Sequence, residues 1–332
     1  MSRVGHAVPS LLKPVVSFGE MLLRYSPAGA GGLHDSKAFA VHVAGAEANV
    51  AIGLASLGCP ARMATVLPDD VLGDRAAAAL AAHGVAMSGC ARVPGRIGTL
   101  YLESPRHGRE GGFFYDRAGS AFALADAAAI DWDAVLPGAA WLHVSGITAA
   151  LGVGPVAQLR RAVAAAARLG VAISFDCNYR PALWRGREAE APALLREFVA
   201  SASLVFAGDA DARLLLGAGT TADLLARFET VQTVATTLRE DNGATARLAA
   251  RITTRRRSCL VEAEVIEPFV DRVGAGDAFA AGILYGLGSG WDTARAARFA
   301  HRVCLMKHGI VGDFATFRAA EVIAVLGSRN SS

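Results

Sequence analysis

Residues 271–277 bring together the groups that a phosphoryl-transfer reaction needs. They read Asp-Arg-Val-Gly-Ala-Gly-Asp, and an apolar run that predicts a buried helix follows them. Gly274 and Gly276, on either side of Ala275, allow a tight turn whose backbone N–H groups can bind an anion at a helix N-terminus. Asp277 can accept the proton of an attacking hydroxyl while the amides hold the phosphoryl oxygens. The alternative, an Asp that only caps the helix, leaves the paired glycines unexplained.

A second glycine-containing segment lies about 230 residues earlier. Residues 44–51 read Ala-Gly-Ala-Glu-Ala-Asn-Val-Ala. The two segments resemble the signatures of the ribokinase-like (PfkB) carbohydrate kinases, an early Gly-Gly-x-x-x-Asn at the sugar site and a late Asp-Thr-x-Gly-Ala-Gly-Asp. Arg272 stands where that family usually has Thr, which is similar to the 2-keto-3-deoxygluconate kinase branch. The resemblance implies that Gly45 and Asn49 bind the sugar, although Gly45 could also be only a turn glycine.

A third segment, residues 176–184, reads Asp-Cys-Asn-Tyr-Arg-Pro-Ala-Leu-Trp after an apolar run that predicts a strand. It resembles a segment of the 2-keto-3-deoxygluconate kinases, and fructokinases often share its Asn and Arg. The planar guanidinium of Arg180 suits a carboxylate or phosphate oxygens. The resemblance implies that Asn178 and Arg180 bind the substrate. The alternative is a structural Arg bonded to carbonyl groups at the strand end.

Two short segments of alternating pattern, 37–43 and 99–115, predict a small antiparallel sheet that stands off the core. The resembled kinases carry such a sheet as a lid over the sugar and often dimerise through it, which implies a homo-oligomer here. Tyr101, Tyr115 and Arg117 resemble the lid residues that hold an acid sugar in those kinases. An aldonic acid offers a carboxylate for Arg117, whereas the alternative is an Arg exposed on a lid strand.

The nucleotide side is indicated by residues 236–241, which read Thr-Thr-Leu-Arg-Glu-Asp. They resemble a segment of the keto-deoxygluconate branch, which implies a phosphate contact for Arg239 beside the glycine turn. The family's Asn-x-x-Glu motif is linked to magnesium and phosphate binding, but this chain has Gly208 and Asp211 in its place. Asp211 can still hold a magnesium-bound water, because magnesium commonly keeps several waters. The implied cofactors are ATP and Mg²⁺.

Apolar segments alternate along the chain with alanine-rich segments of helical length. The predicted strands are residues 15–19, 61–66, 141–145, 171–176, 204–207 and 233–236, and the predicted helices are residues 48–57, 74–83, 155–169 and 190–200. This order predicts a mostly parallel sheet covered by helices on both faces, with a site beyond the carboxyl ends of the strands. With the resemblance, the expected fold is an α/β ribokinase-like three-layer core with a small β-sheet lid. The expected organisation is one domain over residues 14–326, with lid segments at about 33–45 and 97–122 and flexible termini at 1–13 and 327–332.

The bulk composition limits the kinds of partner. The 332 residues are 53% hydrophobic, and a net charge of +3 is too mild to indicate a nucleic-acid or membrane partner. Five scattered cysteines include no C-x-x-C pair and favour reduced thiols. No run of about 18 uncharged apolar residues predicts a membrane span. We therefore expect a cytoplasmic enzyme that acts on small molecules.

Taken together, the motifs predict an ATP-dependent kinase that phosphorylates the terminal hydroxyl of 2-keto-3-deoxygluconate to give the 6-phosphate. By the resemblance, Asp277 takes the hydroxyl proton and the amides of Gly274, Ala275 and Gly276 form the anion hole. The alternatives are a kinase of fructose or 5-dehydro-2-deoxygluconate, and a sugar-binding relative without turnover. A dinucleotide-binding enzyme is disfavoured because the glycine turn lacks the third glycine of the Rossmann spacing.

Overall fold

A large sheet forms the centre of the molecule. The computed structural model describes residues 13–29, 31–103, 111–217, 219–241 and 245–329, and within them this sheet has the strand order β13-β12-β11-β10-β9-β8-β1-β4-β5. Its strands are β1 (Val15–Phe18), β4 (Ala61–Pro68), β5 (Ala86–Val93), β8 (Trp141–Ser145), β9 (Ala172–Asp176), β10 (Leu204–Phe206), β11 (Thr233–Asp241), β12 (Ala246–Thr254) and β13 (Ser258–Val265). The pairings from β11 to β5 are parallel, and β12 and β13 extend the edge as antiparallel strands. The inner strands read as apolar runs because both of their faces are buried.

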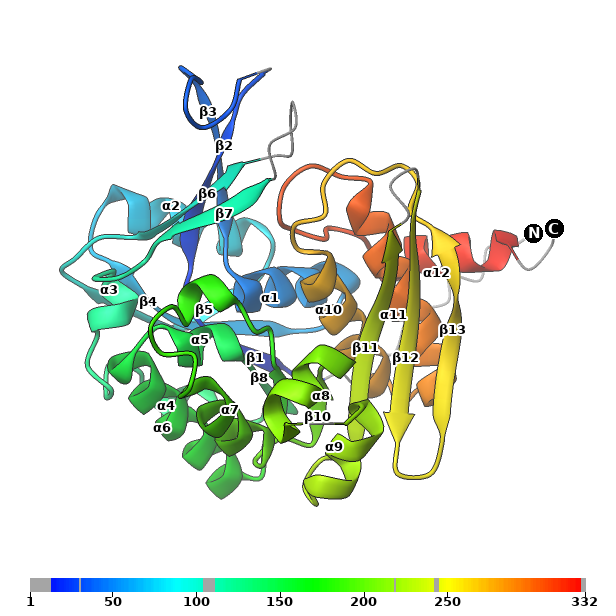
Figure 1. The fold of residues 1–332 in the computed structure, drawn as a ribbon. Coiled ribbons are helices and arrows are strands. Elements are labelled where there is room, and N and C mark those ends of the chain that lie inside the picture. Colours follow the sequence, from blue (N-terminus) through cyan, green and yellow to red (C-terminus); the bar gives the residue numbers. More distant parts are fainter. Residues whose placement is uncertain (1–12, 30, 104–110, 218, 242–244, 330–332) are drawn as a thin grey trace, which may run out of the picture.

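Helices cover both faces of this sheet, which gives three layers (Figure 1). One face carries α1 (Ala46–Leu57), α2 (Val71–Ala82), α10 (Ala275–Gly288), α11 (Thr293–His308) and α12 (Ala319–Arg329). The other carries α3 (Ala121–Leu124), α4 (Trp132–Val135), α5 (Gly146–Ala150), α6 (Val153–Leu169), α7 (Ala191–Val199), α8 (Asp209–Leu216) and α9 (Thr221–Arg227), with a 3₁₀ turn at Pro181–Leu183. None of the helices in the described residues combines the length and apolar character that crossing a membrane requires.

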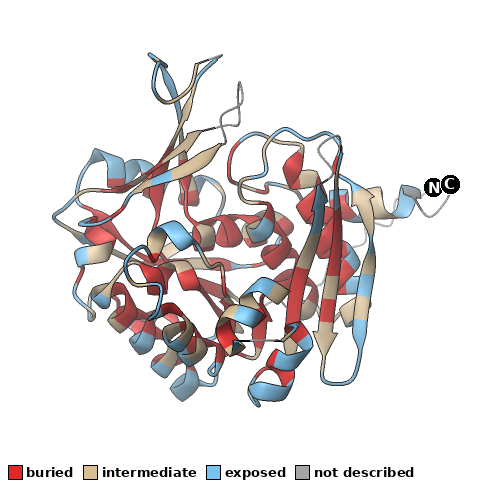
Figure 2. Cartoon of the chain, in the orientation of Figure 1, coloured by how far each residue is buried: buried red, intermediate tan, exposed pale blue. Residues whose placement is uncertain are grey.

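A second, smaller sheet stands apart from the core (Figure 1). It has the order β3-β2-β6-β7, from β2 (Leu22–Pro27), β3 (Phe39–Ala44), β6 (Gly98–Glu103) and β7 (Gly112–Asp116). Figure 2 shows it as mostly half-buried and exposed, in contrast to the buried interior of the core. The expectation of a wholly antiparallel sheet is wrong, because β2 and β6 pair in parallel. A parallel pair needs a long crossover, and the chain between β2 and β6 supplies one by passing through the core.

Small residues set the position of α10 within the core. A Cβ atom on Gly53 of α1 would lie 2.9 Å from the Cβ of Ala281 in α10. A Cβ atom on Gly282 of α10 would lie 2.6 Å from the Cα of Ala300 in α11. The three helices therefore pack at backbone distance, and dense packing of this kind holds the N-terminus of α10 in one place.

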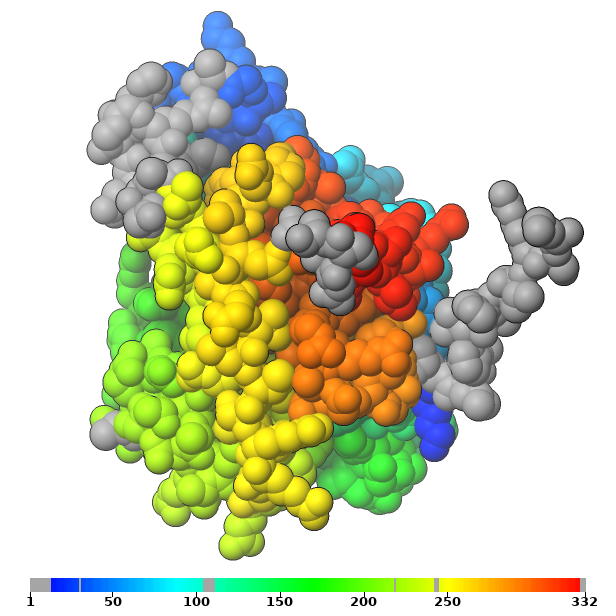
Figure 3. Space-filling model, turned by 90° about the vertical axis from the view of Figure 1, so that its right-hand side faces the viewer, coloured from blue at the N-terminus to red at the C-terminus, as the bar shows by residue number. Residues whose placement is uncertain are grey.

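All predicted strands and helices are present, but other elements were not predicted, among them β2, the edge strand β5 and the helices α11 and α12. The strand predicted at residues 233–236 continues to Asp241, because β11 pairs with β12 along its full length. The hairpin of β12 and β13 was not predicted, and it forms the outer surface seen in Figure 3. Its exposure explains the weak signal, since β13 has no fully buried residue. The expected flexible termini, 1–13 and 327–332, lie largely outside the described residues.

Candidate active site

A cavity of about 640 Å³ opens between the small sheet and the carboxyl ends of the parallel strands. This is the edge at which sites form in open α/β sheets. Most of the residues singled out from the sequence line it, namely Gly45, Asn49, Tyr115, Arg117, Asn178, Arg180, Asp211, Gly274, Gly276 and Asp277. The structure thus brings five segments that are distant in the chain to one cavity.

The glycine turn begins α10. Gly274 is the N-cap residue of this helix, with φ of 79°, and Asp277 lies in the first turn. Two features exclude a side chain at Gly274. Its backbone is left-handed, a conformation that favours glycine, and an added Cβ would lie 2.0 Å from the carbonyl oxygen of Asp313. No atom lies within 4 Å of an ideal Cβ on Gly276, which faces the cavity. The first-turn amides of α10 can therefore be reached by an anion.

Asp277 is held beside this turn by Asn49. The Nδ2 atom of Asn49 in α1 donates a hydrogen bond of 2.6 Å to Oδ2 of Asp277. Burial raises the pKa of Asp277 to about 7, and the carboxylates of Glu47 and Asp313 act in the same direction. The hydrogen bond from Asn49 and the charge of Arg180 oppose the rise in this pKa. A carboxylate with a pKa near neutrality suits general-base catalysis.

The chain turns sharply into the cavity after β9. Asn178 has φ of 36°, a left-handed conformation that Asn tolerates better than most residues, and its N–H donates to Oδ1 of Asp176 at 3.0 Å. Burial raises the pKa of Asp176 to about 8, assisted by the charges of Asp277 and Asp211. Arg180, beyond the turn, lowers the pKa of all three carboxyl groups. Asp176 was not among the predicted site residues, although its position at the end of a predicted strand could have indicated that it lies at the site.

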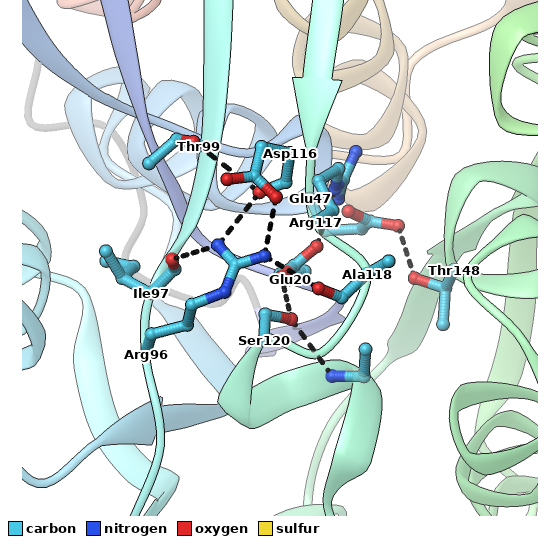
Figure 4. Close-up of polar contacts among 11 residues, drawn as sticks. Glu20, Glu47, Arg96, Ile97, Thr99, Asp116, Arg117, Ala118, Ser120 and Thr148 are labelled. Carbon is cyan, nitrogen blue, oxygen red and sulfur yellow. Dashed lines mark hydrogen bonds and ion pairs between the residues drawn. The ribbon is translucent and has the colours of Figure 1, made fainter.

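Arg117 lines the cavity and is also anchored behind it. Its Nε donates to Oε2 of Glu20 at 2.6 Å, and both side chains are almost fully buried. Ser120 donates to the other oxygen of the same carboxylate, as Figure 4 shows. The guanidinium carbon of Arg117 lies 5.9 Å from the centroid of the Tyr115 ring. Arg117 is therefore not an exposed arginine on a strand of the small sheet.

Two further sets of contacts lie near Arg117 (Figure 4): one joins Arg96 to the end of β7, and the other joins α1 to β8 and α5 within the core. Arg96 donates to Oδ1 of Asp116 at 2.6 Å and to backbone carbonyls nearby. Glu47 of α1 accepts hydrogen bonds from Ser145 at 2.7 Å and from Thr148 at 3.1 Å. Burial raises the pKa of Glu47. Sequence reasoning missed these contacts because they join residues far apart in the chain.

Asp211 has a structural task as well as a place at the cavity. Its Oδ2 accepts the N–H of Gly208 at 2.8 Å, which caps the start of α8. Within the described part of the chain, no group of three or more His, Cys, Asp or Glu side chains is arranged to hold a metal ion. One cavity carboxylate fits a hydrated magnesium ion, which keeps most of its waters and is bound mainly by substrate phosphates.

Three of the predicted residues lie away from the cavity lining. Tyr101 stacks on Tyr25, with ring centroids 5.3 Å apart, because neighbouring residues of a strand point to opposite faces and Leu100 takes the cavity side. Arg239 lies within β11, and its guanidinium carbon is 5.3 Å from the centroid of the Phe269 ring. Ala275 is buried.

The amide of Ala275 is already engaged within the turn. Its N–H donates to the carbonyl oxygen of Arg272 at 3.3 Å. The N–H groups of Gly276 and Asp277, which follow in the first turn of α10, are therefore better placed to meet an anion. Other cavity residues were not predicted as site residues, among them Thr236, Thr237, Tyr179, Phe113 and Arg272. Of these, Arg272 stood out in the sequence only as an unusual residue before the glycine turn.

Comparisons with known proteins agree with this geometry. Residues 12–306 match the family model described as pfkB family carbohydrate kinase. A 2-dehydro-3-deoxygalactonokinase from Haloferax volcanii is 32% identical over 94% of this chain and 96% of its own. A 2-dehydro-3-deoxygluconokinase from Bacillus subtilis is 28% identical, over 93% and 94%. The crystal structure of a 2-dehydro-3-deoxygluconokinase from Thermotoga maritima superposes with a TM-score of 0.88 at 35% identity, covering 94% of this chain and 97% of that one. This chain therefore belongs to the pfkB family and is a carbohydrate kinase.

Proposed function

We propose that this kinase transfers the γ-phosphoryl group of ATP to the terminal hydroxyl of 2-keto-3-deoxygluconate, forming the 6-phosphate. The observation that carries the proposal is the position of Asp277, which lines the cavity in the first turn of α10 and lies close enough to Arg180 for that charge to lower its pKa. The relatives named for 2-dehydro-3-deoxy acids support an acid sugar, since 2-dehydro and 2-keto describe the same group. The 2-dehydro-3-deoxygalactonokinase makes the C4 epimer the second candidate.

The proposed reaction follows from the groups around Asp277. The sugar hydroxyl attacks the γ-phosphorus, the bond from phosphorus to the oxygen of ADP breaks, and the hydroxyl proton passes to Asp277. The N–H groups at the start of α10 hold the phosphoryl oxygens as charge spreads over them. Asp211 would hold nucleotide-bound magnesium through a water molecule, and the ion would supply further charge neutralisation. Because little proton transfer is needed early in a loose transition state, a carboxylate with a pKa of about 7 is basic enough.

Arg117 and Arg180 support the choice of an acid sugar. Both line the cavity, and a carboxylate at the far end of the substrate would receive charge-assisted hydrogen bonds from either guanidinium. Fructose and 5-dehydro-2-deoxygluconate are the alternative substrates, and the first has no carboxylate.

We also propose self-association through the small sheet, on which Phe114 is exposed. A monomeric mass by light scattering would contradict that assembly.

The test is turnover with ATP over a panel of acid and neutral sugars, together with the Asp277→Asn variant. The variant keeps the size of the side chain and its contact with Asn49 but cannot accept the proton. We expect 2-keto-3-deoxygluconate or its C4 epimer to have the highest kcat/KM, and Asp277→Asn to lower kcat by roughly 10²–10⁴. Near-normal turnover in the variant would remove the assigned base. A preference for fructose would overturn the proposed substrate alone.

A further inference from the structure

A buried ionic cluster joins the small sheet to the glycine turn. Arg24, at the centre of strand β2, is 2% exposed and lies outside the cavity lining. Its Nη2 lies 3.2 Å from Oδ2 of Asp271, and its Nε lies 2.8 Å from Oδ2 of Asp313. These two carboxylates belong to the segments that lead into and pack against the start of α10. One arginine of the small sheet thus holds two carboxylates of the core.

The carboxylate of Asp271 shapes the turn directly. Its Oδ1 accepts the N–H of Val273 at 3.0 Å, and its Oδ2 accepts the N–H of Gly312 at 3.1 Å. The same Oδ2 is paired with Arg24. Asp271 therefore ties the residue before Gly274 to the neighbouring loop, and Arg24 orients the carboxylate that makes both contacts.

Asp313 supports the turn from the other side. Its carbonyl oxygen lies against Gly274, so closely that a Cβ there would be 2.0 Å away. A shift of Asp313 is therefore transmitted to the N-cap residue of α10, because the contact leaves no free space. Lys307 of α11 is fully buried nearby and donates to the carbonyl of Ile310 at 3.2 Å. Arg24 and Lys307 together balance the two carboxylates.

We propose that Arg24 is a positioning residue for phosphoryl transfer, which sets the geometry of the glycine turn and makes that geometry depend on the small sheet. This rests on the proposed use of the turn to hold the transferring group. Arg24 lies outside the cavity lining, and it acts through Asp271 and Asp313. Arginine suits the role because its guanidinium group is planar, remains charged and can pair with two carboxylates at once.

The decisive variants are Arg24→Met and Arg24→Lys. Methionine keeps much of the length of the side chain but removes the guanidinium that pairs with both Asp271 and Asp313, so the turn relaxes from its productive geometry. Lysine keeps the charge at one point and cannot pair with both carboxylates in the same plane. We expect kcat per folded molecule to fall by roughly 10–100-fold in Arg24→Met and by about threefold to tenfold in Arg24→Lys. The KM for sugar should stay within about threefold of the wild-type value.

The matched control is Arg75→Met. Arg75 in α2 donates to the carbonyl of Val41 in β3 at 3.2 Å, so it also links the small sheet to the core but does not touch the turn. Its kcat should be unchanged. All values are measured with the sugar that the wild-type enzyme phosphorylates best and are normalised to the folded fraction by circular dichroism.

The outcomes separate this proposal from the proposed function. Normal kcat per folded molecule in both Arg24 variants would overturn the positioning role, while a loss in Asp277→Asn would still support the assigned base. Equal losses of kcat in Arg24→Met and Arg75→Met would also overturn it, because any loosened contact of the small sheet would then be sufficient. If Arg24→Met does not fold, Arg24→Lys carries the test, and an unchanged kcat in that variant contradicts the proposal.

Discussion

The two ends of the cavity are built from different parts of the chain. At the proposed sugar end, side chains such as Arg117 and Arg180 face the cavity themselves. At the phosphoryl end, the groups proposed to hold the phosphoryl oxygens are backbone amides, and the ionic cluster of Arg24, Asp271 and Asp313 supports them, with Arg24 outside the cavity lining. Each end has one buried arginine. Arg117, which follows the last strand of the small sheet, pairs with Glu20 at the sugar end. Arg24, in β2, pairs with Asp271 and Asp313 at the phosphoryl end.

This difference separates the expected consequences of mutation. An arginine that lines the cavity can contribute differently to each substrate, so its loss changes discrimination between sugars. An arginine behind a turn affects every substrate in the same way, because it changes only the position of the amides. Substitutions at the sugar end should therefore change kcat/KM selectively, and those at the phosphoryl end should lower kcat for all sugars.

Among the variants that compare the two ends, Arg117→Ala is expected to have the largest effect on stability. This substitution removes a cation from the sugar end and leaves the buried carboxylate of Glu20 without its partner. An unpaired buried charge costs roughly 3–5 kcal/mol in the free energy of unfolding. The double variant Arg117→Ala/Glu20→Gln removes that charge and should recover much of the loss, as measured by urea unfolding.

The double variant also tests the substrate contact. We expect kcat/KM for 2-keto-3-deoxygluconate to stay lower by about tenfold or more, because a charge-assisted hydrogen bond contributes roughly 1.5–3 kcal/mol. The loss for fructose should be much smaller, since it has no carboxylate. Equal losses for both sugars would mean that Arg117 only anchors the small sheet.

The phosphoryl end was predictable from sequence because its signals are local. The spacing of Gly274, Gly276 and Asp277 and the apolar run that follows define a turn before a helix, and the structure has both. Arg180 was singled out from a segment that follows an apolar strand and resembles one of the 2-keto-3-deoxygluconate kinases, and it lines the cavity. Such patterns depend on neighbours within a few residues, which a single sequence displays directly.

The contacts behind the cavity could not be predicted in this way. Arg24 and Asp271 are 247 residues apart, and Glu20 and Arg117 are 97 residues apart. Which carboxylate meets which arginine depends on how the two sheets are placed, and no local pattern encodes that placement. Tyr101 shows a related limit, because strand alternation required either Leu100 or Tyr101 to face the cavity and the sequence alone did not decide between them.

At the phosphoryl end, Gly276→Ala should give a smaller effect than the loss of Arg117. Outside the helix itself no atom lies within 4 Å of the added Cβ, so the melting temperature should not fall. The methyl group would instead crowd the approaching phosphoryl oxygens, and kcat should fall by roughly tenfold for every sugar. By contrast, Gly274→Ala should lower the melting temperature, because its Cβ meets the carbonyl oxygen of Asp313. A normal kcat in Gly276→Ala would place the phosphoryl group away from this turn.

The smallest effect is expected where the two ends meet, at Asn49. Its hydrogen bond to Asp277 stabilises the ionised carboxylate, so Asn49→Leu should raise the pKa of Asp277 above its present value of about 7. The basic form of Asp277 is lost as the pH falls through this pKa, and the acidic limb of the kcat/KM profile should therefore move to higher pH, by about one unit. At pH 9 the carboxylate is ionised in both proteins, and their kcat values should converge. An unshifted limb would contradict the role of this hydrogen bond, whereas a higher KM for sugar at every pH would show that Asn49 also binds the substrate.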